Sequence, residues 1–129
     1  MNNLRRIYAA FGGKLVGSRV LKKNVCEVLA RMEEDIILYI TKNCWFFGST
    51  EDAWAFTLTG NDLRDQHLII IGDELLMQSR RQIQYTIAHE IGHVMLRHRN
   101  SILERQSKSE IKHQEKEADQ FAKRYAIFG

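Results

Sequence analysis

The sequence His89-Glu90-Ile91-Gly92-His93 constrains the fold of this chain more than any other feature. It has the pattern HExxH, and the residues around it have helical periodicity. Residues i and i+4 of an α-helix lie about 40° apart around its axis, so the two histidines project from one face. Two imidazoles at this spacing can bind one zinc ion, and the adjacent glutamate can accept a proton from a water molecule. The motif therefore predicts a helix that carries part of a metal centre.

The residues around the motif predict an amphipathic helix over residues 79–98. Ser79 and Gln82 have the spacing of a capping box, in which the serine hydroxyl accepts a hydrogen bond from the backbone N–H three residues on. No proline interrupts the segment. Apolar residues recur along it at spacings of three and four, namely Ile83, Ile87, Ile91, Val94 and Met95.

A catalytic zinc site usually has three protein ligands and one open position for water. The metzincin pattern is excluded, because Leu96 and Arg99 occupy the positions of its glycine and its third histidine. A second helix can supply a carboxylate instead, and residues 115–122 (EKEADQFA) place Glu115 and Asp119 on one helical face. We expect Glu115 to bind the metal. We expect Asp119 to accept a hydrogen bond from the other ring nitrogen of a ligating histidine.

Small residues on the same face of this second helix predict close packing against the HExxH helix. Ala118 and Ala122 have the spacing that would allow the two helices to approach each other. Glu117 lies on a different part of the helix surface, so it is the weaker candidate for the third ligand.

The chain resembles the ImmA/IrrE-type metallopeptidases, which are gluzincin-like zinc enzymes of bacteria and phages. The resemblance covers about residues 68–128 and rests on HEIGHVMLRH, on HLIIIGDELLMQSRRQIQYTIA before it and on EKEADQFA after it. It implies a zincin-like domain in which His89, His93 and Glu115 bind zinc and Glu90 is the general base. It also implies proteolysis of a regulatory protein, often a repressor.

Length and composition predict one compact domain over residues 1–129, without the DNA-binding or sensor domain that many such relatives carry. The content of 44% hydrophobic and 27% charged residues is ordinary for a globular protein, and the net charge of +3 does not by itself argue for nucleic-acid binding. Cys26 and Cys44 are expected to be reduced thiols. The sequence has neither a signal peptide nor an apolar run near the ~20 residues of a membrane span, so we expect a cytoplasmic protein.

The hydrophobic pattern predicts an α+β fold, with a small antiparallel or mixed sheet packed on helices. The expected strands are residues 35–41, 44–48, 53–59 and 67–71. The expected helices are residues 2–10, 18–32, 79–98 and 112–127, with a break at Gly12-Gly13 and a polar loop over residues 99–111.

Several other side chains have structural interpretations that compete with functional ones. We expect His67 and His113 to face solvent, and His98 to interact with the C-terminal dipole of the motif helix. Tyr125 could reach a substrate but is expected to be structural. A cluster of aromatic residues either lines a peptide groove or packs in the core: Trp45, Phe46, Phe47, Trp54 and Phe56.

These observations predict a zinc-dependent endopeptidase that acts on a specific cytosolic regulatory protein, such as a transcriptional repressor encoded nearby. A strand edge, from residues 53–59 or 67–71, would bind the substrate in extended form. The alternative is a regulatory protein that contains zinc, binds a DNA-binding partner and does not cleave it. The presence of Glu90 favours the enzyme, because a purely structural zinc site needs no general base.

Overall fold

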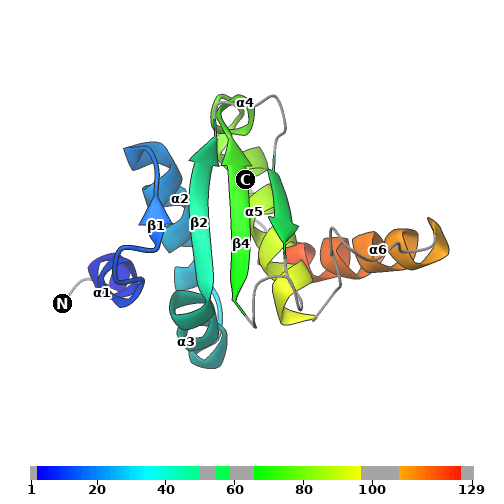
Figure 1. The fold of residues 1–129 in the computed structure, drawn as a ribbon, viewed down its shortest axis with the longest axis horizontal. Coiled ribbons are helices and arrows are strands. Elements are labelled where there is room, and N and C mark those ends of the chain that lie inside the picture. Colours follow the sequence, from blue (N-terminus) through cyan, green and yellow to red (C-terminus); the bar gives the residue numbers. More distant parts are fainter. Residues whose placement is uncertain (1–2, 50–54, 59–65, 97–107, 126–129) are drawn as a thin grey trace.

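The computed structural model describes residues 3–49, 55–58, 66–96 and 108–125 (Figure 1). The chain order is α1 (Asn3–Ala10), β1 (Leu15–Val16), α2 (Arg19–Ala30), α3 (Glu34–Asn43), β2 (Cys44–Ser49), β3 (Ala55–Leu58), β4 (His67–Gly72), α4 (Asp73–Leu76), α5 (Arg80–Met95) and α6 (Lys108–Arg124). Helices pack against one face of a small sheet, so the fold class is α+β, as the sequence predicts.

The sheet is mixed, with the strand order β1-β2-β4-β3. The pairs β1–β2 and β2–β4 are parallel, whereas β3 pairs with β4 in the antiparallel sense. Strand β4 is therefore paired on both sides, and β3 is an edge of the sheet within the described residues. The expectation that residues 67–71 offer a free edge to a substrate is wrong, because the hydrogen-bonding groups of β4 already face two neighbouring strands.

The side chains of strand β2 show that one face of the sheet is buried and the other is exposed. Side chains alternate along a strand, and Cys44 and Phe46 are buried while Trp45 and Phe47 are 41% and 44% exposed. The buried face packs against α2 and α5, which lie behind the sheet in Figure 1. Phe46 is thus a core residue, whereas the two exposed aromatic residues lie on the opposite face. Of the other aromatic residues in the predicted cluster, Trp54 and the side chain of residue 56 lie outside the described part of the chain.

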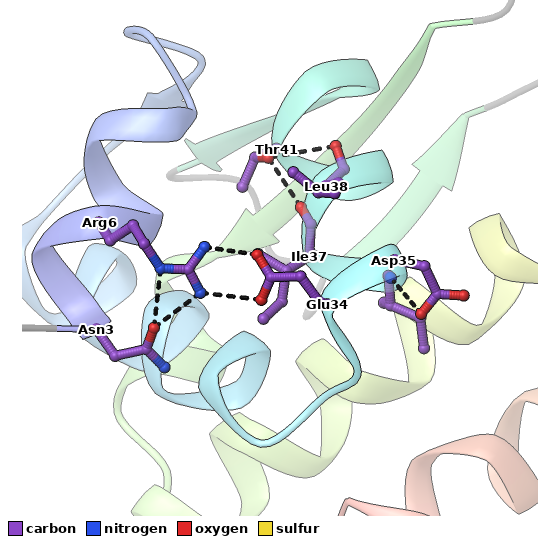
Figure 2. Close-up of polar contacts among 8 residues, drawn as sticks. Asn3, Arg6, Glu34, Asp35, Ile37, Leu38 and Thr41 are labelled. Carbon is purple, nitrogen blue, oxygen red and sulfur yellow. Dashed lines mark hydrogen bonds and ion pairs between the residues drawn. The ribbon is translucent and has the colours of Figure 1, made fainter.

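Residues 35–41 form a helix, so the strand predicted there is wrong. Helix α3 has acidic residues in its first turn and Lys42 in its last turn, which suits the helix dipole. The Thr41 hydroxyl donates to the carbonyl of Ile37 at 2.8 Å, within the helix (Figure 2). A short apolar run does not separate a strand from a buried helix by its periodicity. Here tertiary packing decides, by burying one helical face formed by Ile36, Ile37, Ile40 and Thr41.

Helix α1 ends as predicted and is held to α3 by an ion pair. Gly12 and Gly13 have φ values of 58° and 89°, which end the helix in a conformation that favours glycine. The Arg6 guanidinium contacts both carboxylate oxygens of Glu34, at 2.7 and 3.1 Å (Figure 2). The same guanidinium also donates to the side chain of Asn3 on its own helix, so Asn3 helps to orient Arg6 toward α3.

The structure contradicts the prediction for His67 and confirms the prediction for the two cysteines. The prediction that His67 faces solvent is wrong, because the residue is buried and its Nε2 atom lies 2.9 Å from the Tyr39 hydroxyl. Its position at the start of an inner strand explains the burial. Both cysteines are free thiols, as predicted. Burial raises the pKa of the Cys26 thiol to about 11 and that of the Cys44 thiol to about 12, so both stay protonated at neutral pH.

The last helix begins earlier than predicted. Helix α6 starts at Lys108, so the polar loop expected over residues 99–111 is wrong at its C-terminal end; the rest of that loop, together with His98, lies outside the described residues. His113 lies on α6 and is solvent-exposed, as expected. Within the described residues, no helix combines the length and the apolar character needed to cross a membrane.

Candidate metal centre

Helix α5 is fixed at its start by a cap and along its length by the core. The Ser79 hydroxyl accepts a hydrogen bond from the backbone N–H of Gln82 at 3.1 Å, as the sequence predicts. The stripe of apolar side chains that follows is buried against the sheet and α2, and its members are Ile83, Ile87, Ile91 and Val94. This anchoring leaves the adjacent helical face, with the two histidines, directed toward α6.

A buried polar contact also joins α5 to α2. The Gln84 side-chain amide donates to the Asn24 side chain at 2.9 Å and to a Glu27 carboxylate oxygen at 3.3 Å. The other Glu27 oxygen accepts from Arg80 at 2.9 Å. These contacts fix the rotation of α5, because polar groups buried between two helices tolerate few alternative arrangements.

Helix α6 packs closely against α5 at a glycine. A Cβ atom added at Gly92 would lie 3.0 Å from a ring carbon of Phe121 and 3.2 Å from its Cβ atom. Ala118 and Ala122 are fully buried, in agreement with the close approach that their size predicts. The HExxH pattern does not by itself mark Gly92 as a packing residue. A glycine inside a helix costs about 1 kcal/mol relative to alanine, and this cost was the available signal that packing requires it.

Three side chains from α5 and α6 meet at one point. The Nε2 atoms of His89 and His93 are 3.2 Å apart. One carboxylate oxygen of Glu115 lies 2.9 Å from Nε2 of His89, and the other lies 3.1 Å from Nε2 of His93. One potential ligand atom from each of the three side chains lies within 4.8 Å of the other two.

This donor set is compatible with a metal ion. Zinc–nitrogen and zinc–oxygen bonds of about 2.0–2.2 Å in a tetrahedron place neighbouring ligand atoms roughly 3.3–3.6 Å apart. The separations of 2.9, 3.1 and 3.2 Å between the side chains fall close to that spacing. A small outward adjustment of Glu115, which is about half exposed, would lengthen its two contacts with the histidines toward the tetrahedral range.

The remaining ring nitrogen of His89 is held by Asp119. Its Nδ1 atom lies 2.9 Å from the Asp119 carboxylate, which also accepts a hydrogen bond from the Tyr85 hydroxyl at 3.1 Å. A carboxylate partner favours the proton on Nδ1 and leaves the lone pair of Nε2 directed at the other two ligand atoms. Burial, followed by the hydrogen bond to Asp119, raises the pKa of the Tyr85 phenol. The contact from Tyr85 was not anticipated from the sequence.

Glu90 is buried beside this centre. Its side chain lines a pocket of about 260 Å³ together with Tyr85, His89 and Asp119, and with the polar residues Gln82 and Thr86. The pocket therefore places a carboxylate next to a candidate ligand in a space large enough for solvent or part of a substrate.

The C-terminal end of α6 is bonded to the loop between α2 and α3. The Tyr125 hydroxyl donates to a carboxylate oxygen of Glu33 at 2.6 Å, and Arg31 donates to the backbone carbonyl of Tyr125 at 3.0 Å. Burial, together with the hydrogen bond to Glu33, raises the pKa of Tyr125 to about 12. Tyr125 thus has the structural contact expected of it, and it holds the helix that carries Glu115.

The comparisons with known proteins locate one family in this region. Residues 64–127 match the family model Peptidase U49. The match includes β4 and both helices that contribute to the candidate centre, and it supports a peptidase role with a protein as substrate. Comparison with curated proteins and with solved structures finds no match.

Proposed function

We propose that the chain is a zinc-dependent endopeptidase of the ImmA/IrrE type. The observation that carries this proposal is the convergence of His89, His93 and Glu115 beside the buried Glu90, within the region that matches a peptidase family. Two imidazoles and one carboxylate form a donor set that zinc accepts, and they leave a position open for water.

Each residue has a distinct role in the proposed reaction. His89, His93 and Glu115 hold the ion, which when bound supplies an activated water and polarises the scissile carbonyl. Glu90 accepts the proton of the attacking water and then delivers it to the leaving amine nitrogen. Asp119 keeps His89 in the tautomer that presents Nε2 to the ion, and Tyr85 holds the Asp119 carboxylate in place.

In this proposal, the substrate binds as an extended peptide that pairs with strand β3. This strand is an edge of the described sheet and contacts α5, the helix that carries both histidines and Glu90. An extended peptide added to that edge would run beside the candidate centre, with backbone hydrogen bonds giving affinity. Such binding requires a segment that can be extended, which favours a flexible loop or linker of the substrate protein.

The proposed substrate is a cytosolic regulator, such as a transcriptional repressor encoded near this protein. The resemblance to ImmA/IrrE-type enzymes supports this class. A general digestive role is disfavoured, because an unselective protease in the cytoplasm would attack proteins that the cell needs.

Co-expression with neighbouring gene products tests the function. We expect the wild-type protein to cut one regulator while leaving casein intact. Glu90→Gln should retain metal and fold but lose about 10² to 10⁴ in rate, because the amide does not accept the proton. Lys116→Ala, an exposed change on α6, is the matched control and should cut normally. Equal cleavage by Glu90→Gln and wild type would refute the assigned base. A regulator that binds without being cut by the wild type would favour the non-cleaving alternative.

A further inference from the structure

Helices α1 and α2 enclose an apolar groove that has no part in the proposed catalytic centre. The groove has a volume of about 530 Å³. Its apolar residues are Leu4, Tyr8 and Cys26, and the Tyr8 ring is about half exposed. An exposed aromatic side chain beside an apolar floor is typical of a surface that binds a partner.

Four cationic residues form the walls of the same groove. Arg5 comes from α1, and Arg19, Lys22 and Lys23 come from α2. The aliphatic stems of these side chains line the groove while their charged ends remain near solvent, and the Lys22 ammonium lies 5.6 Å from the centre of the Tyr8 ring. No Asp or Glu is among the residues that line the groove within the described chain.

Positive charge is concentrated in this part of the molecule. The first 32 residues contain seven Lys or Arg and a single acidic residue, Glu27, whereas the remaining residues contain 12 Lys or Arg and 15 Asp or Glu. Glu27 is not among the residues that line the groove, and its carboxylate contacts Arg80 and Gln84 on α5. Arg6, the neighbour of Arg5, is neutralised by Glu34 (Figure 2). The cations that line the groove therefore lack such a local counter-charge among the lining residues.

The groove lies at the opposite end of the molecule from α6. In Figure 1, α1 is at one end of the long axis and α6 extends at the other, with the sheet between them. A molecule bound between α1 and α2 would therefore leave the candidate metal centre accessible.

We propose that this groove is a docking site for an acidic amphipathic helix of another protein. Apolar side chains at spacings of three, four and seven residues would fill the groove, and Asp or Glu on both flanks would meet Arg5, Arg19, Lys22 and Lys23. A nucleic acid would satisfy the cations but would place phosphates and sugars over an apolar floor. The helix matches both the floor and the charged walls. This inference goes beyond the proposed peptidase function, because docking does not require cleavage.

Fluorescence anisotropy with a labelled synthetic peptide tests the proposal. The probe is an 18-residue helix with Leu along one face and Glu on its flanks, at about 0.15 M salt. We expect saturable binding to the full chain. Replacing every flanking Glu by Lys, or every Leu by Ser, should abolish binding. Glu90→Gln should bind the probe as the wild type does, so a failure of the peptidase proposal would leave this result unchanged.

Charge-reversal variants identify the surface. Arg5→Glu combined with Lys23→Glu changes one exposed cation on each wall and should weaken binding at least about tenfold. Lys112→Glu combined with Lys123→Glu changes the net charge equally on exposed positions of α6 and should leave affinity within about twofold. Tyr8→Ser tests the apolar floor and should weaken binding several-fold.

Three outcomes would overturn the docking proposal. The first is absence of peptide binding by a folded wild-type protein. The second is an equal loss in the groove variant and in the α6 variant, which would mean that net charge alone attracts the peptide. The third is tight binding of duplex DNA or phosphatidylglycerol vesicles that depends on Arg5 and Lys23 while the peptide does not bind. That result would assign the groove to a different class of partner.

Discussion

Both ring nitrogens of His89 contact a carboxylate, and these two contacts fix the orientation of the ring. Its Nδ1 atom faces Asp119 and its Nε2 atom faces Glu115, each at 2.9 Å. A histidine held in this way presents a lone pair in a fixed direction. We therefore expect Asp119 to influence a bound metal ion through His89 without being a ligand itself.

Asp119→Ala should weaken zinc binding without abolishing it. Loss of the carboxylate frees the ring of His89 to rotate and to change tautomer, and such changes typically cost 10- to 100-fold in metal affinity. Tyr85→Phe removes one hydrogen bond to the same carboxylate and should cost less, about two- to fivefold. Competition with a chromogenic chelator measures both constants. The neighbouring exposed change Gln120→Ala is the control. Wild-type affinity in Asp119→Ala would show that this contact does not tune the centre.

At the level of the helices, the spacing of α5 and α6 decides whether the candidate ligands meet. Gly92 permits the contact with Phe121 on one side of α6, while Asp119 and Glu115 face the histidines. The C-terminal end of α6 is fixed by the hydrogen bond between Tyr125 and Glu33. Helix α6 is therefore positioned at two points along its length.

Gly92→Ala should destabilise the protein although alanine favours helices. The added Cβ atom would lie 3.0 Å from the Phe121 ring, and overpacking of this kind costs about 1–3 kcal/mol. The gain in helix propensity offsets at most about 1 kcal/mol. Urea unfolding measures the net loss. Adding Phe121→Leu should restore part of the stability lost in Gly92→Ala, although it destabilises the wild type. Simple additivity of the two changes would contradict direct contact.

Tyr125→Phe should reduce stability at neutral pH but have less effect in acid. The hydrogen bond from Tyr125, followed by a backbone hydrogen bond, lowers the pKa of Glu33. A carboxyl group with a lowered folded-state pKa stabilises the protein above its unfolded pKa of about 4.3, and this contribution disappears as the pH falls through the folded-state pKa. The difference in unfolding free energy between wild type and Tyr125→Phe should therefore shrink below about pH 4. A difference independent of pH would mean that Glu33 is not the partner that matters.

Helices and strands could be predicted where the hydrophobic periodicity and the capping residues agree. They could not be predicted where the hydrophobic pattern fits both a helix and a strand. Helix α5 was predictable because Ser79 supplies a cap and the isoleucines recur with helical spacing. Helix α3 was not, because its run of apolar residues fits a strand as well as a buried helix and only the packing against α1 and the sheet distinguishes them.

The candidate centre was predictable in its residues but not in its supports. HExxH and the spacing of Glu115 and Asp119 are local patterns, so sequence alone brings their side chains to defined helical faces. The contacts of Tyr85 and Gly92 with α6 depend on how the two helices cross, which is a tertiary property without a local signature. The hydrogen bond between Tyr125 and Glu33, 92 residues away, is also a tertiary contact without a local signature.

At the scale of the whole molecule, the sheet separates two surfaces of different character. One end carries the groove between α1 and α2 with its cations, and the other carries α6, which brings Glu115 to the two histidines of α5 (Figure 1). The edge strand β3 lies beside α5 and offers backbone groups to an extended peptide. A protein substrate could thus be held at a site distant from the bond that is cut, which would restrict cleavage to partners carrying both features.

The zinc content of the purified protein tests the central claim most directly. Protein loaded with zinc and then dialysed should contain about one ion per chain, because three converging side chains with an open fourth position suit that metal. His89→Ala and Glu115→Ala should each lose most of it, whereas Glu117→Ala, two residues away on α6, should retain it. Wild-type protein that is folded yet holds no zinc after loading, or Glu115→Ala that holds as much as the wild type, would contradict the account.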